Sequence, residues 1–270
     1  MSAPAPAAAA IPNEPLLLRQ DRDGIATLTL NRPRQYNALS EALIGELEAA
    51  LASLAASPDI RVVVVAGRGV AFCAGHDLKE MRTHRDKAYF VELFARCSRM
   101  MLGLSRLPQP VIARVHGIAT AAGCQLAASC DMVVAADVAR FATSGINVGL
   151  FCSAPAVPLS RSIPAKPAFE MLMTGDFIDA ATALQHGLVN RVVPLDGLDD
   201  AVGDLAQRII AKSPVAVATG KRMFHRQLAM DVDAAHEFAV ETMAANMMAE
   251  DVGEGIDAFA AKRLPVWKGR

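Results

Sequence analysis

Two glycine-containing segments are the parts of this sequence best able to do chemistry. The first, AFCAGHDLKEM at residues 71–81, follows a β-branched run and precedes a helix pattern. The second, HGIATAAGCQLAASCD at residues 116–131, follows another strand pattern and opens a helix of small residues. Ligands of open α/β sheets bind where strands end, and a helix start offers unpaired N–H groups and a positive dipole end. Two loops that each supply one backbone N–H could therefore bind a developing oxyanion together.

Each segment also has a purely structural interpretation. Residues 71–81 could form a plain connecting loop, and the small side chains of residues 116–131 could serve only tight helix–sheet packing. Taken one at a time, the segments leave these alternatives open. The arrangement of the strands and helices around both segments distinguishes a ligand site from a purely structural role.

Strand and helix patterns alternate along the first part of the chain. Apolar runs predict strands at residues 25–30, 61–66, 111–115 and 132–135. Between them, Ser40 is a typical N-cap and apolar residues at helical spacing follow it. Further helices are predicted over about residues 84–105 and 121–129, and residues 67–77 have the composition of a loop. Strands that alternate with helices indicate the α/β class.

Beyond about residue 165 the strand signals fade, apart from Leu188–Val193. Further helices are predicted there, over about residues 180–186, 197–211, 215–229, 233–249 and 253–262. We therefore expect an Ala/Pro-rich disordered tail (1–14), an α/β core (15–195) and a helical C-terminal region (196–270).

Composition excludes several classes of protein. Of the 270 residues, 53% are apolar and 20% are charged, which is typical of a globular chain and not of a disordered one. A net charge of −1 supplies no bulk field for nucleic acid or an anionic membrane, and no apolar run reaches the ~18 residues of a membrane span. The five cysteines lack CxxC spacing, so we expect neither a disulfide framework nor a zinc site. The first residues lack the pattern of a secretory signal or a mitochondrial leader.

Taken together, the segments resemble the crotonase (enoyl-CoA hydratase/isomerase) superfamily over about residues 16–267. Six pieces occur in the family's order: LNRPRQYNALS, RVVVVAGRGVAFCAGHDLKEM, PVIARVHGIATAAGCQLAASCD, FATSGINVGLF, AFEMLMTGDFIDAATALQHGLVNRVVP and GEGIDAFAAKRLPVW. The resemblance implies a spiral core of stacked ββα units and a helical C-terminal region that forms trimers, often paired into hexamers. It also implies an acyl-CoA thioester as ligand, with coenzyme A as part of the substrate and no separate cofactor or metal.

The resemblance further assigns residues to an oxyanion hole and to coenzyme A. In the family, two backbone N–H groups polarise the thioester carbonyl and stabilise an enolate, and by position they belong to His76 and Ala122. The family is glycine-rich at the second position, where this chain has Ala121-Ala122-Gly123. The residues at positions that would contact the substrate are Arg34, Tyr36, Ala38, Ala74, His76, Asp77, Leu78, Lys79 and Lys262. For Arg34, Tyr36 and Lys262, an ordinary surface role stays open.

The acid–base residues are where this sequence departs from the family. Family hydratases use two glutamates around a water molecule and the substrate double bond, and Gln125 and Gly145 stand at those positions here. Glutamine cannot act as a carboxylate base and glycine has no side chain, whereas acid–base assistance contributes ~10²–10⁴-fold per group. Ordinary syn hydration of a 2-enoyl-CoA should therefore be crippled. Residues 149–155 (GLFCSAP) also differ from the family's glycine-rich loop.

Few nearby residues could substitute for the two acids. The imidazole of His76 has a suitable ordinary pKa, near ~6.5, whereas His116 is more typical of packing at a strand end. Asp77 and Asp131 are typical of residues that cap or brace turns. Cys152 could line an acyl pocket, but a reactive cysteine needs a nearby cation or helix N-terminus, so packing is favoured.

Two functions of different classes follow from the sequence. The first is an enzyme that acts on an acyl-CoA thioester through the oxyanion hole, by a hydratase-like reaction, isomerisation, decarboxylation or thioester hydrolysis. The second is a non-catalytic acyl-CoA-binding protein that kept the fold and lost the acids. We expect a homotrimer or hexamer without nucleic-acid or membrane partners. The expected location is the cytoplasm, or the mitochondrial matrix if the source is eukaryotic.

Overall fold

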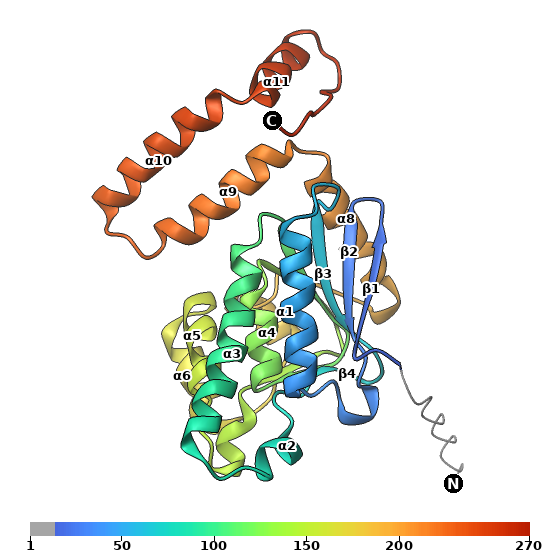
Figure 1. Cartoon of the computed structure of the whole chain (residues 1–270), viewed down its shortest axis with the longest axis vertical. Helices are drawn as coiled ribbons and strands as arrows, with labels where there is room; N and C mark the ends of the chain where they lie inside the picture. The colour runs from blue at the N-terminus through green and yellow to red at the C-terminus, as the bar shows by residue number, and fades with distance from the viewer. Residues whose placement is uncertain (1–13) are drawn as a thin grey trace.

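Two β-sheets form the centre of the fold, and helices cover them (Figure 1). The computed structural model describes residues 14–270, so the predicted tail lies outside the described residues except for Glu14. The first sheet has six strands in the order β1-β2-β3-β5-β7-β10, and the second has four in the order β4-β6-β8-β9. In the first sheet, β1 is antiparallel to β2 and all other neighbouring strands are parallel.

The two sheets differ in the length of their strands. The strands of the first sheet are Leu17–Arg22 (β1), Ile25–Leu30 (β2), Val62–Gly67 (β3), Val111–Val115 (β5), Met132–Ala136 (β7) and Arg191–Val193 (β10). Those of the second sheet are Ala71–Cys73 (β4), Ile118–Thr120 (β6), Arg140–Ala142 (β8) and Ile178–Asp179 (β9). The second sheet is therefore a small platform beside the main one.

A two-strand unit repeats along the chain. β3 leads into β4, β5 into β6 and β7 into β8, and each step passes from the first sheet to the second. Helices follow each unit: Leu78–Arg82 (α2) and Lys87–Arg106 (α3), then Ala122–Ser129 (α4), then Ser153–Ser162 (α5) and Ala165–Thr174 (α6). This stacking of ββα units is the spiral core that the family resemblance implied, so the predicted fold class is confirmed.

Helix α1 (Glu41–Ala55) begins and packs as its sequence predicts. The Ser40 side chain accepts a hydrogen bond from Leu43 N at 3.2 Å, which confirms the N-cap. The apolar face is buried, and its members are Leu43, Ile44, Leu47, Leu51 and Leu54. This face joins the buried side of α3 in the main hydrophobic core.

Strand β3 is buried on both faces, as a continuous β-branched run predicts. Val63 and Val65 belong to the main core on the side of α1 and α3. Val62 and Val64 belong to a second cluster, which α8 (Leu198–Ile210) closes from the other side. The domain boundary at residue 195 stays a prediction: α8 follows it directly and still packs on the first sheet.

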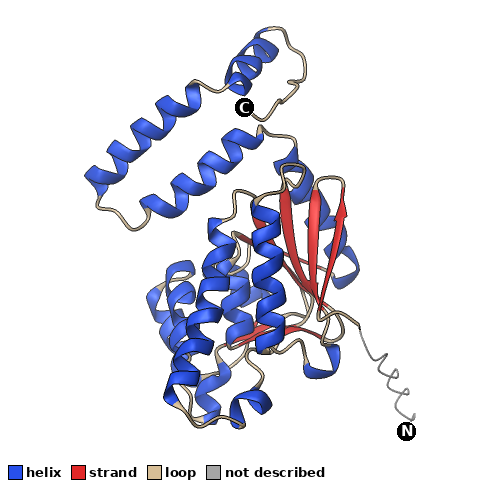
Figure 2. Ribbon diagram, viewed as in Figure 1, coloured by secondary structure: helices blue, strands red, loops and turns tan. Residues whose placement is uncertain are grey.

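Three helices, α9 (Pro214–Gln227), α10 (Val232–Met247) and α11 (Glu250–Ala260), extend beyond the sheets (Figures 1 and 2). We call residues 214–260 the C-terminal arm. α10 buries none of its residues. Large apolar side chains on the arm are exposed instead: Phe224, Leu228, Val232, Val240, Met243, Met247, Met248, Ile256 and Phe259. Exposed apolar surface of this extent is typical of a protein–protein interface.

One buried ionic cluster fixes the arm to the core. The Asp131 carboxylate, next to the start of β7, lies 2.6 Å from Lys221 Nζ and 2.6 Å from His225 Nε2, both on α9. Lys221 Nζ also donates to Leu104 O at 2.7 Å and to Gln109 O at 2.8 Å. Burial lowers the pKa of Lys221, although the charge of Asp131 opposes this shift. Asp131 therefore braces the fold.

The sequence patterns missed the shortest and most exposed elements. Residues 67–77, predicted as a loop, contain β4, and β6 and β8 are likewise too short to show a period. Strand β1 has mostly exposed side chains, so no apolar alternation marks it. Helices α2, α5 and α6 were also missed, and α5 holds Pro158, a residue that disfavours a helix interior. The other predicted ends agree with the structure to within one helical turn.

Among residues 14–270, no helix is both long and apolar enough to cross a bilayer.

Removing the carboxylate from the ionic cluster should destabilise the protein strongly. Asp131→Ala leaves the Lys221 ammonium buried without its counter-charge, which costs about 3–5 kcal/mol. Urea unfolding followed by circular dichroism measures the change. Glu92→Gln is the matched control, because it breaks an exposed pair with Arg99 that contributes at most about 1 kcal/mol. Equal losses in the two variants would contradict the anchoring role of Asp131.

Candidate functional site

The two glycine-containing segments meet where the loop after β4 contacts the first turn of α4. A Cβ added to Gly75 would lie 3.1 Å from Ala122 N and 2.9 Å from Ala121 Cβ. The φ of +94° at Gly75 also favours glycine. A Cβ on Gly123 would lie only 2.0 Å from Cys73 O. Side chains at either position would push the two segments apart, so both glycines are required by this close approach.

The contact between the two segments leaves the backbone N–H groups of His76 and Ala122 without a hydrogen-bond partner in the described chain. Leu39 and His76 form a parallel bridge, in which Leu39 N donates to Gly75 O (2.7 Å) and Leu39 O accepts from Asp77 N (3.1 Å). The bridge uses the groups on either side of His76, so the His76 N–H faces the opposite direction. Ala122 is the first residue of α4, where helix N–H groups have no intrahelical partner. Within residues 14–270, no hydrogen bond from either N–H is found.

Backbone strain is concentrated at Ala121. Its φ of 51° and ψ of −121° correspond to the first central position of a type II′ turn, which favours glycine. A non-glycine residue held in such a region costs of order 1–3 kcal/mol, and strain of this kind clusters at functional sites. The Ala121 N–H donates to Ala142 O at 3.0 Å, which holds the turn in place. Ala122, the predicted donor, has helical geometry.

The predicted substrate contacts are mostly brought together. Residues 36–39 and 74–77 run side by side, since Ala74 N donates to Tyr36 O at 3.0 Å and Leu39 pairs with His76. Ala38, in the first of these segments, is buried. The exposed predicted contacts are Arg34, Tyr36, Leu78 and Lys79. These four residues therefore form the outer rim of the candidate site.

Two residues that the sequence analysis did not single out hold this rim. Asn37 is fully buried; its Nδ2 donates to Ala71 O at 2.8 Å and its Oδ1 accepts from Arg32 N at 2.9 Å. Arg32 also pairs with Asp77 at 2.8 Å. The sequence signal that could have identified Asn37 is its residue type, because asparagine tolerates left-handed turns. In the structure Asn37 adopts such a turn, with a φ of 56°.

Asp77 acts as a helix cap in this structure. Its Oδ1 accepts hydrogen bonds from Lys79 N and Glu80 N, at the start of α2. Burial would raise the pKa of Asp77, but the Arg32 hydrogen bond and charge and the backbone N–H groups outweigh it, so the pKa is lowered. The carboxylate is thus ionised and engaged in bracing the loop. Its predicted contact with the substrate stays a prediction.

The His76 side chain packs against α3. Its ring lies edge-on to Phe94, with 5.3 Å between the ring centroids. Nε2 is buried and has no partner among the described residues. Burial lowers the pKa of His76 to about 4, so the ring is neutral at pH 7 and is a weak base. The site therefore contains a neutral imidazole next to the N–H group of the same residue.

The positions of the two family glutamates differ in the space around them. Gln125 is 4% exposed, and its Oε1 has no hydrogen-bond partner in the described chain. A Cβ on Gly145 would lie 2.7 Å from Leu150 O and 2.8 Å from Cys152 Sγ. The φ of Gly145 is outside the left-handed region, so packing and not backbone strain is the obstacle. The loop that precedes α5 has filled the second position.

Other candidate side chains serve packing. His116 Nε2 lies 2.9 Å from Gly69 O, and burial lowers the pKa of His116. Cys152 is 6% exposed, its Sγ lies 3.4 Å from Thr143 O, and burial raises its pKa. All five cysteines are buried and free. Within residues 14–270, no group of three or more His, Cys, Asp or Glu side chains is arranged to ligate a metal.

Lys262 is the predicted contact that the structure does not bring to the site. It follows α11, and Figure 1 shows α11 at the opposite end of the molecule from α2. The direction of the C-terminal arm causes this separation, which no local sequence pattern encodes. Within one chain, Lys262 therefore lies far from the His76 loop, and its predicted contact with coenzyme A stays a prediction.

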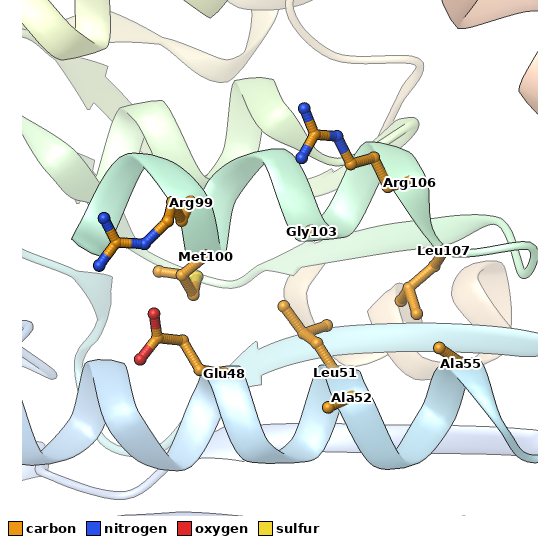
Figure 3. Close-up of a pocket in the computed structure, with 9 residues that line it drawn as sticks. All are labelled: Glu48, Leu51, Ala52, Ala55, Arg99, Met100, Gly103, Arg106 and Leu107. Atoms are coloured by element: carbon orange, nitrogen blue, oxygen red, sulfur yellow. The ribbon is translucent and has the colours of Figure 1, made fainter. Parts of the chain in front are cut away.

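A groove of about 320 Å³ lies between α1 and α3 (Figure 3). Its lining residues are Glu48, Leu51, Ala52, Ala55, Arg99, Met100, Gly103, Arg106 and Leu107. Leu51 and Met100 point into the gap between the helices, and Arg106 points away from it. None of the predicted site residues lines this groove, so it is separate from the converging loops.

Comparison with known proteins places this geometry in a family. The enoyl-CoA hydratase/isomerase family model matches residues 20–270. A solved enoyl-CoA hydratase from Mycobacterium smegmatis is 56% identical, with a TM-score of 0.93, over 94% of this chain and 99% of that one. Enoyl-CoA hydratase domain-containing protein 3, mitochondrial, from Rattus norvegicus is 45% identical over 92% of this chain and 83% of that protein. The 2,3-dehydroadipyl-CoA hydratase of Escherichia coli (strain K12) is 36% identical over 96% of this chain and 100% of that protein.

These similarities span nearly all of the described residues, and they agree with the stacked ββα core. The chain therefore belongs to the enoyl-CoA hydratase/isomerase family, within the crotonase superfamily.

Proposed function

We propose that this chain binds acyl-CoA thioesters and polarises the thioester carbonyl with the N–H groups of His76 and Ala122. The observation that carries the proposal is the approach of Gly75 to Ala122 N, which directs both segments to one place. Two donors preorganised around one oxygen stabilise the negative charge that develops on it. Family membership supports the ligand class, because a relative is named as a hydratase of a CoA thioester.

The proposed chemistry passes through a thioester enolate without a pair of carboxylates. Gln125 offers an amide and Gly145 has no room for a side chain. The neutral His76 ring belongs to the same residue as one of the two donors, and its low pKa makes it a weak base. Isomerisation, decarboxylation and thioester hydrolysis are therefore favoured over two-glutamate hydration.

A second candidate is a non-catalytic acyl-CoA-binding protein. The replacement of both family acids favours it, whereas the intact pair of N–H donors favours an enzyme. Turnover assays with short and medium acyl- and enoyl-CoAs distinguish the two, because only an enzyme consumes them. In either case coenzyme A enters as part of the ligand, and no separate cofactor is proposed.

The outer rim of the candidate site supports binding of coenzyme A, and the C-terminal arm supports association with further copies of the chain. Arg34 and Lys79 are exposed cationic side chains beside Tyr36 and Leu78, and coenzyme A carries phosphates that such side chains bind. The exposed apolar side chains of the C-terminal arm support assembly into a homotrimer or hexamer. In such an assembly, Lys262 would approach the site of another copy of the chain and not its own.

The names of several relatives bear on location. The rat relative and its human counterpart are both named as mitochondrial proteins. These names support the mitochondrial matrix, the alternative given for a eukaryotic source, and lend no support to the cytoplasm.

Binding of CoA thioesters tests the ligand class directly. We expect calorimetry with acetyl-, butyryl- and octanoyl-CoA to detect binding of at least one. Gly75→Ala should weaken it by about tenfold or more, or 1.4 kcal/mol, because the new Cβ would crowd Ala122 N. Gly203→Ala is the control, since a Cβ there meets nothing within 4 Å. No binding at millimolar concentration would remove the ligand claim.

Hydration of crotonyl-CoA should be at least ~10²-fold slower than in an enzyme with both glutamates. Gln125→Glu combined with Gly145→Glu should lower the melting temperature and restore little activity, because the new side chain at position 145 meets Leu150 O and Cys152 Sγ. Gln125→Glu alone is the folding control. An ordinary hydratase rate in the unmodified protein would show that another group transfers the protons.

The buried His76 ring predicts a pH dependence of stability. Its pKa is about 4 in the folded protein and ~6.5 when unfolded. Between these values the unfolded state binds a proton that the folded state does not, so stability falls as pH drops through this window. His76→Gln should reduce this fall in urea unfolding measured at about pH 7 and pH 4.5. His84→Gln, at an exposed histidine, is the control; an identical fall in all three proteins would refute the prediction.

A further inference from the structure

Arg32 places a positive charge at the candidate site that the proposed binding of coenzyme A does not use. Its side chain is 15% exposed, and its guanidinium has two partners: Nη1 donates to Ala38 O, and Nη2 donates to Asp77 Oδ2 at 2.8 Å. Its charge also reaches the Cys73 thiol, at the end of β4, where it opposes the rise in pKa that burial causes. The guanidinium therefore contacts both of the segments that run side by side in the candidate site.

Two peptide groups connect this charge to the His76 N–H. In a trans peptide the C=O and the N–H point in opposite directions, and the described chain has no cis peptide bond. Ala38 O, which accepts from Arg32, shares its peptide group with Leu39 N. Leu39 N donates to Gly75 O at 2.7 Å, and Gly75 O shares its peptide group with His76 N. A guanidinium that fixes Ala38 O therefore also fixes the direction of the His76 N–H, two peptide groups away.

The same chain of hydrogen bonds polarises the donor at its end. A hydrogen bond from a charged donor is roughly twice as strong as a neutral one, and hydrogen bonds in a chain strengthen one another by ~10–30% per bond. The Arg32 cation draws electron density from the Ala38 carbonyl, so each N–H that follows becomes a better donor. The Ala122 N–H already has the positive dipole end of α4. The His76 N–H lies outside any helix, and Arg32 supplies its positive charge instead.

We propose that Arg32 is a positioning residue, which directs and polarises the His76 N–H through the peptide groups 38–39 and 75–76. The inference rests on the proposed function, in which this N–H donates to the thioester carbonyl. Asp77 holds the guanidinium in place, because its Oδ2 accepts from Arg32 while its Oδ1 caps α2. The Arg32 side chain is largely buried behind both segments, so it acts on the ligand through the backbone.

Two ligands that differ only in the carbonyl oxygen isolate the effect of Arg32. Butyryl-CoA has this oxygen, and S-butyl-CoA, a thioether with the same number of carbons, lacks it. With the full-length protein, we expect calorimetry to show at least ~10-fold tighter binding of butyryl-CoA, the contribution of two ordinary hydrogen bonds. Arg32→Met should reduce this preference to within about threefold and change the affinity for S-butyl-CoA by less than about threefold, because only the Ala122 donor stays aligned.

The ligand carbonyl provides a second readout, which a change in stability alone does not move. In ¹³C NMR of butyryl-CoA labelled at the carbonyl carbon, hydrogen-bond donors move the carbonyl resonance downfield. We expect a downfield shift in the complex with the unmodified protein and a smaller shift in the saturated complex with Arg32→Met. Arg32→Lys should recover part of the shift and part of the preference, because lysine keeps the charge but lacks the fork that reaches Ala38 O and Asp77 together.

Asp77→Asn tests the residue that holds the guanidinium. The variant keeps the size of the side chain and a capping oxygen but removes the charge, so it should also lower the preference for butyryl-CoA. Because both residues act through one chain of hydrogen bonds, the double variant with Arg32→Met should lose no more of the preference than Arg32→Met alone. Arg96→Met is the matched control, since Arg96 is also partly buried and pairs with Glu48 at 2.7 Å, between α1 and α3. It should change neither the preference nor the carbonyl shift.

Each other outcome overturns a specific statement. Equal weakening of both ligands by Arg32→Met would show that Arg32 serves the binding of coenzyme A and would overturn the inference. An unchanged preference and carbonyl shift in Arg32→Met, or in Asp77→Asn and Arg32→Lys if Arg32→Met does not fold, would show that the ion pair only stabilises the fold. Additive losses in the double variant would overturn the shared chain of hydrogen bonds. Failure of the unmodified protein to bind either ligand would overturn the proposed function itself, and the inference with it.

Discussion

The end of β4 and the first turn of α4 share a space in which no side chain fits. Gly123 lies directly against Cys73 O, and Gly75 turns the chain with a positive φ next to Ala122 N. Because β4 and β6 are parallel neighbours in the second sheet, the segments that follow them leave at the same edge. Glycine then allows these segments to touch. The pair of N–H donors and the strain at Ala121 both depend on this contact.

A site made of backbone donors separates carbonyl binding from proton transfer. The N–H groups of His76 and Ala122 come from the course of the chain, so side-chain replacement does not remove them. The acid–base groups are side chains and can change independently. In this chain the two family positions hold an amide, Gln125, and a glycine, Gly145, while Asp77 of the first motif is engaged with Arg32. The proposed polarisation of a carbonyl therefore does not depend on the identity of the residues at positions 125 and 145.

Local signals predicted the elements with strong periodicity and the two motifs. Ser40, the apolar face of α1 and the doubly buried β3 carry enough information in neighbouring residues to be predicted. What escaped prediction depends on contacts between distant segments. Asn37 matters because it bonds Ala71, and the three-residue strands exist only through their neighbours in the second sheet. The place of Lys262 depends on where the C-terminal arm points, which no short pattern records.

The packing of Cys152 against Gly145 also restricts how this sequence can change over time. A carboxylate at position 145 is useful only after Leu150 and Cys152 have moved aside, yet opening that loop has no benefit until the carboxylate is present. Any series of single amino-acid replacements toward a two-acid site therefore passes through an intermediate with a clash or with an empty space in its core. Selection acts against both kinds of intermediate. A two-acid site is thus reached from this sequence only by a coordinated change of Gly145 and of the loop that contains Leu150 and Cys152.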